Sequence, residues 1–200
     1  MPDVTIPGLV LAAILVNNVV FAQFLGICPY LGVSKRLDTA LGMGMAVVFV
    51  MVMAVAITWP IQHYLLAPGA LGEEIDLSYL STIAFILVIA SLVQLVEIVL
   101  KKVLPALYQA LGIYLPLITT NCAILGVAIL AHRQQLSFLQ GLIFAAASAV
   151  GFILAIMLFA GLRESLEQRD VPESLAGAPI AFITAGILAM AFMGFAGLGG

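Results

Sequence analysis

The chain has 200 residues, of which 64% are hydrophobic and only 8% are charged, and its formal net charge is −3. A soluble domain carries about a quarter charged residues, so this composition excludes a soluble globular protein and predicts an integral membrane protein surrounded by lipid. The small net charge and the absence of a basic stripe exclude nucleic acid as a partner. The length fits one transmembrane domain over residues 1–200.

Six apolar stretches separate the clusters of charged residues. Each has the ~20 residues that a helix needs to cross the hydrocarbon core, and none alternates as a membrane β-strand does. We therefore expect an all-α integral membrane protein. Its six transmembrane helices are predicted over residues 5–27, 40–63, 78–100, 105–131, 138–162 and 178–198.

Basic residues predict the orientation. Six of the seven Lys and Arg residues lie after the first, third or fifth segment, and only Arg133 lies on the other side. Loops rich in Lys and Arg stay in the cytoplasm, so we expect both termini outside. The six are Lys35, Arg36, Lys101, Lys102, Arg163 and Arg169.

An internal repeat surrounds the two cysteines. The string CPYLGV at 28–33 returns as CAILGV at 122–127, 94 residues later. Repeats of three helices each must have opposite orientations, so we expect two inverted repeats, over about 1–100 and 101–200. In transporters of this design, binding sites gather near the repeat interface.

Glycine and proline lie close to both cysteines. Gly26 and Pro29 flank Cys28, and Gly126 follows Cys122. Proline removes a backbone donor and glycine loosens a helix. We therefore expect helices one and four to be interrupted, with breaks at Pro29 and Gly126 that let both cysteines reach a shared axis.

Polar residues accompany both segments. Asn17, Asn18 and Gln23 lie in the first segment, and Thr119, Thr120 and Asn121 directly precede the second cysteine. Backbone groups that a break frees inside a bilayer need internal partners. These side chains are expected to satisfy such groups or to donate to a thiolate.

The cysteines allow two interpretations. Both can be small apolar residues that pack between helices. Alternatively, Cys28 and Cys122 share a site for iron–sulfur, zinc or cuprous ions, which thiolates favour. An iron–sulfur cluster needs four ligands, so another chain would have to supply the others.

Glu97 is the candidate for an ion path. Carboxylates inside a membrane often mark such paths, but Glu97 also lies four residues before Lys101, the spacing of a helical ion pair. The chain has no nucleophile paired with a base and no phosphate-binding loop. Alone, it should catalyse nothing.

Three strings of the sequence resemble the A-type subunits of bacterial Rnf complexes. They are FLGICPYLGVSK at 24–35, LGIYLPLITTNCAILGVA at 111–128 and ITAGILAMAFMGFAGL at 183–198. The resemblance implies a membrane subunit of an ion-translocating ferredoxin:NAD oxidoreductase, an electron-transport translocase that moves Na⁺ or H⁺. The sister family is the E subunit of the Na⁺-translocating NADH:quinone reductase, and VNN at 16–18 favours the Rnf form.

The resemblance also implies a cofactor and partners. Cys28 and Cys122 would bind a 2Fe–2S cluster shared with a homologous E-type subunit of opposite topology, near Gly26, Pro29 and the 119–121 stretch. The other partners would be the B, C, D and G subunits of the Rnf complex. The location would be the bacterial cytoplasmic (inner) membrane, with both termini periplasmic.

Three alternatives stay open at this point. The chain could be the E subunit of the sodium-translocating quinone reductase, or a small inverted-repeat transporter for a soft metal ion. It could also be a structural assembly subunit with incidental cysteines. Visible absorption from iron–sulfur charge transfer would separate an electron carrier from the other two classes.

Overall fold

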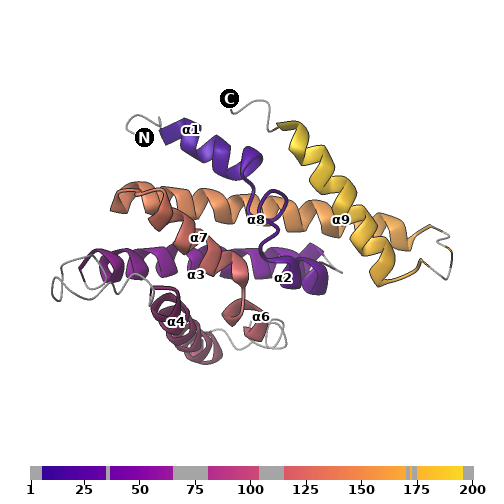
Figure 1. The fold of residues 1–200 in the computed structure, drawn as a ribbon. Coiled ribbons are helices and arrows are strands. Elements are labelled where there is room, and N and C mark those ends of the chain that lie inside the picture. The colour runs from indigo at the N-terminus through magenta and orange to yellow at the C-terminus, as the bar shows by residue number, and fades with distance from the viewer. Residues whose placement is uncertain are drawn as a thin grey trace.

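The fold comes from a computed structural model, which describes residues 6–34, 37–64, 81–103, 115–169, 172 and 175–195. All secondary structure in these ranges is helical (Figure 1), which confirms the all-α prediction for the described residues. The elements are α1 (Ile6–Leu11), the π-helix η1 (Ala12–Val16), α2 (Ile27–Val33), α3 (Leu37–Tyr64), α4 (Ser81–Val103), α6 (Leu115–Thr119), α7 (Cys122–Arg133), α8 (Phe138–Glu167) and α9 (Ala178–Met193).

Two long helices, α3 and α8, lie side by side at the centre of the fold (Figure 1). Small residues let the two backbones approach closely, as is common between membrane helices. A Cβ atom on Gly44 of α3 would lie only 2.7 Å from Cγ1 of Ile153 on α8. The pair also supplies most of the fully buried large side chains, among them Met43, Val47, Met51, Phe152, Ile156 and Phe159.

Three of the described helices are long and apolar enough to cross a membrane: α3, α8 and the Thr82–Val99 part of α4. Shorter apolar helical stretches cover Ile6–Val16, Leu117–Arg133 and Ala178–Met193. The described part of each predicted segment therefore contains a helix or an interrupted helix, while residues 78–80, 105–114 and 196–198 of these segments, and Lys35 and Arg36, lie outside the described residues. The arrangement as six spans in two inverted repeats stays a prediction.

The first and fourth segments are interrupted, as the sequence predicted. The first breaks at residues 17–26, between η1 and α2, and the fourth breaks at residues 120–121, between α6 and α7. The predicted positions of the breaks were wrong, because Pro29 lies inside α2 and Gly126 lies inside α7.

The broken segments pack on the long helix of the opposite half of the chain. The α1–η1 segment contacts α8, and α7 contacts α3 more extensively than α8. The third helix of each half stays with its own long helix, α4 on α3 and α9 on α8. Because each broken segment packs on the long helix of the other half, both breaks lie in the same region, between α3 and α8.

Candidate cysteine site at two helix breaks

The first break depends on Asn18, whose side chain is completely buried. Its Nδ2 donates to the carbonyl oxygens of Ile14 and Gly151, both at 2.9 Å. Its Oδ1 accepts from the backbone N–H groups of Val20 at 2.9 Å and Phe21 at 3.4 Å. One amide thus satisfies four backbone groups away from water, which confirms the expected role of Asn18.

Gly26 ends the first break with a backbone φ of +77° and begins α2. This left-handed conformation is unfavourable for residues that have a Cβ. A Cβ atom here would also lie 2.9 Å from the Phe152 ring and 3.2 Å from Ala123 Cβ. The glycine backbone therefore approaches α7 closely, and its N–H lies 2.9 Å from Cys122 Sγ, to which it donates.

The second break is short and is capped by Asn121. The Asn121 side chain accepts from the backbone N–H of Ala123 at 3.0 Å, so it is the N-cap of α7. Cys122 follows as the first residue of α7, and Cys28 is the second residue of α2. Both thiols therefore lie in the first turn of a helix.

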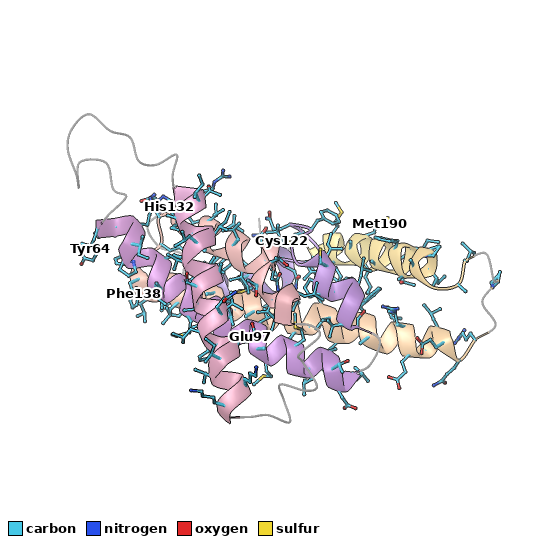
Figure 2. The ribbon with its side chains drawn as sticks, turned by 90° about the horizontal axis from the view of Figure 1, so that it is seen from below. Tyr64, Glu97, Cys122, His132, Phe138 and Met190 are labelled. Atoms are coloured by element: carbon cyan, nitrogen blue, oxygen red, sulfur yellow. The ribbon has the colours of Figure 1, made fainter. Side chains whose placement is uncertain are left out.

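The two cysteines differ in their surroundings. Cys28 is exposed, whereas Cys122 is half-buried and accepts the hydrogen bond from Gly26. Because Gly26 lies two residues before Cys28, the two cysteine-bearing helices begin at adjoining points. Figure 2 shows Cys122 where α7 begins.

Pro29 and Gly126 have other roles than the predicted ones. Pro29 is the third residue of α2, and in the first turn of a helix its missing N–H costs nothing. Gly126 lies where the Leu25 side chain fills the space that a Cβ atom would need. Pro29 thus helps to begin α2. Gly126 leaves room on α7 for Leu25, which lies just before α2.

Arg163 fixes the far end of α2. Its Nη1 donates to the carbonyl oxygen of Leu31 at 2.8 Å and to Ser34 Oγ at 3.2 Å. Nearby, the rings of Tyr30 and Phe159 stack with centroids 4.3 Å apart. No local sequence pattern links Arg163 to Leu31, which lies 132 positions away in the chain.

The remaining predicted site residues divide into two places. Thr119 is the last residue of α6 and borders the second break, and Thr120 is an exposed turn residue within that break. Glu97 is half-buried in α4 and not on a cysteine-bearing segment (Figure 2). Its role in an ion path stays a prediction.

The chemistry of the site is that of two soft thiol ligands. Within the described ranges, no group of three or more His, Cys, Asp and Glu residues could hold a metal ion. The described residues offer two free thiols, Cys28 and Cys122, from two adjoining helix starts, and a four-thiolate site would need two more.

Comparison with known proteins gives consistent matches along the chain. The family described as "Rnf-Nqr subunit, membrane protein" matches residues 7–199. The A subunit of the ion-translocating oxidoreductase complex of Syntrophotalea carbinolica is 60% identical over 95% of both chains. The A subunit of the Na(+)-translocating ferredoxin:NAD(+) oxidoreductase complex of Acetobacterium woodii is 55% identical over 97% of this chain and 98% of that one.

Proposed function

This chain belongs to the Rnf-Nqr family of membrane subunits, and on that premise we propose that it carries electrons across the membrane. In the proposal it is one component of an ion-translocating ferredoxin:NAD oxidoreductase. Cys28 and Cys122 supply two of the four thiolate ligands of a 2Fe–2S cluster, and a homologous subunit of opposite topology supplies the other two. The chain crosses a bacterial cytoplasmic membrane with both termini periplasmic.

One observation carries this proposal: the Gly26 N–H that donates to Cys122 Sγ at 2.9 Å. The bond joins the break before Cys28 to the cysteine after the other break. A backbone donor at this distance suits a sulfur that carries negative charge as a metal ligand, because hydrogen bonds to charged acceptors are the stronger ones. Two incidental packing cysteines would not need both helices broken directly before them.

The surroundings of the two cysteines fit a cluster because they can offset its negative charge. A 2Fe–2S centre with four thiolates is negatively charged, which the bilayer interior penalises. This chain would offset part of that charge with the backbone N–H of Gly26, which donates to Cys122 Sγ. When bound, the cluster supplies one-electron transfer between donors and acceptors on either side.

The ligand count requires a partner. Cys28 is exposed on the isolated chain, so a second subunit can approach its thiol. A homologous subunit of the same design would bring two thiols of its own and complete the set. In the proposed complex, the B, C, D and G subunits are the other partners.

The proposal also couples electron transfer to the movement of ions across the membrane. The Acetobacterium woodii relative is named a Na(+)-translocating enzyme, and we extend ion translocation, of Na⁺ or H⁺, to this chain. Glu97 is the candidate carboxylate, as a half-buried acid in a helix of membrane-spanning length. The chain contributes to catalysis only as a part of the complex.

The test is chemical analysis of the intact purified complex. Iron, acid-labile sulfide and the electron paramagnetic resonance signal are measured for the wild type, Cys28→Ser and Cys122→Ser. Each substitution should remove the same single cluster and abolish electron transfer, while clusters on other subunits remain.

The matched control is Ala131→Ser, which adds a hydroxyl to a buried position of α7 away from the cysteines. A helix tolerates this hydroxyl by bonding it to the preceding turn, so iron and sulfide should not change. The proposal fails if both cysteine variants keep the full iron and sulfide content. Metal without labile sulfide would instead favour the soft-metal transporter.

A further inference from the structure

Three buried side-chain atoms have no hydrogen-bond partner within the described part of the chain. They are Tyr30 Oη, Gln62 Oε1 and Asn121 Nδ2. Of these residues, only Asn121 directly adjoins a cysteine. Its side chain is 4% exposed, so no solvent satisfies the amide nitrogen.

The orientation of the Asn121 amide is determined by its cap. Oδ1 accepts from the backbone N–H of Ala123 at 3.0 Å, and only an oxygen can take that bond. The NH₂ end is therefore the unpartnered end. An N-cap alone does not require it, because a serine or aspartate at this position would accept the same bond without adding two donors.

The amide lies at the proposed ligand site. Asn121 Oδ1 is 3.4 Å from the position that a Cβ atom on Gly26 would occupy. The backbone N–H of the same glycine donates to Cys122 Sγ at 2.9 Å. The side-chain amide and the thiol are thus both neighbours of Gly26, from consecutive residues of one helix start.

We propose that Asn121 Nδ2 donates a hydrogen bond to a sulfur atom of the cluster bound by Cys122, and that this bond raises the reduction potential of the cluster. The inference rests on the proposed function. Sulfur in an iron–sulfur cluster accepts hydrogen bonds, and each such bond stabilises the reduced form, which carries more negative charge. Bound in this way, the cluster satisfies the buried donor that the chain leaves unpaired.

The test uses the intact complex with ¹⁵N in the asparagine side chains. Pulsed electron paramagnetic resonance of the reduced cluster should show a ¹⁵N coupling in the wild type, and Asn121→Ser should lose it. The serine keeps an acceptor for the Ala123 N–H but is too short to replace Nδ2, so the cluster should remain with a lower midpoint potential. The control Asn17→Ser changes an exposed asparagine in the first break and should alter neither measurement.

The outcomes separate this inference from the function on which it rests. A wild-type complex that lacks the cluster signal, labile sulfide and matching iron would refute the proposed function itself. A wild-type cluster without any ¹⁵N coupling, and with an unchanged potential in Asn121→Ser, would refute only the Asn121 hydrogen bond. Because the coupling is measured first in the wild type, the result stands even if Asn121→Ser weakens assembly.

Discussion

The two helix breaks place their cysteines in different ways. The first break spans residues 17–26, is held by four hydrogen bonds of Asn18, and leads to the exposed Cys28. The second spans residues 120–121, is capped by Asn121, and leads to the half-buried Cys122. The same repeated string therefore has two different surroundings.

The difference fits the proposed division of the site between two chains. The first break donates to the cysteine of the second through Gly26, so Cys122 is stabilised within the chain. Cys28 has no hydrogen bond to its sulfur among the described residues and faces outward. A site completed by a partner would be expected to have one thiol fixed inside the chain and one presented at its surface.

The largest expected effect comes from Asn18→Leu. Leucine would leave two carbonyl oxygens and two N–H groups without partners, and each buried unsatisfied group costs about 1–3 kcal/mol. We expect a loss of at least about 3 kcal/mol of stability, seen as a much lower thermal midpoint of the purified complex and a loss of cluster iron.

Asn17→Leu is the control for this change, because the neighbouring asparagine is exposed. It should shift the thermal midpoint by no more than a surface substitution does, within about 0.5 kcal/mol. Equal losses in the two variants would mean that the Asn18 bonds do not stabilise the first break.

Sequence reasoning found the interrupted segments but not the positions of their breaks. Proline and glycine show where a backbone can deviate, and Pro29 and Gly126 were chosen on that ground. The breaks instead depend on long-range contacts, such as Asn18 with Gly151 and Gly26 with Cys122, which no local pattern contains. Local composition did predict helical structure for the described part of each segment, because a stretch of ~20 apolar residues is the signal of a helix long enough to cross a membrane.

The next effect concerns Gly26→Ala, which tests the contact between the breaks. The left-handed backbone costs an alanine about 1–2 kcal/mol, and the clash with the Phe152 ring adds overpacking of about 1–3 kcal/mol. We expect a loss of roughly 2–5 kcal/mol in stability, together with a weaker cluster signal as Gly26 moves away from Cys122.

Gly186→Ala is the matched control, since nothing lies within 4 Å of the Cβ atom that it would add to α9. In a helix this change should be neutral or slightly stabilising. Adding Phe152→Leu to Gly26→Ala should recover the steric part of the loss but not the backbone part. A fully stable Gly26→Ala single variant would contradict the close approach.

The smallest effect is expected for Arg163→Gln, at the other end of the helix that carries Cys28. The substitution removes a charged donor from the Leu31 carbonyl and from Ser34, at a partly exposed site where such bonds are worth about 1–1.5 kcal/mol. Hydrogen exchange of the α2 amides should therefore become roughly five- to tenfold faster, since 1.4 kcal/mol corresponds to a factor of ten. The control Arg133→Gln removes an exposed arginine at the end of α7 and should leave exchange in α2 unchanged. If Arg163→Gln also leaves it unchanged, then Arg163 does not hold α2, and the exposed Cys28 would have to be positioned by the partner chain alone.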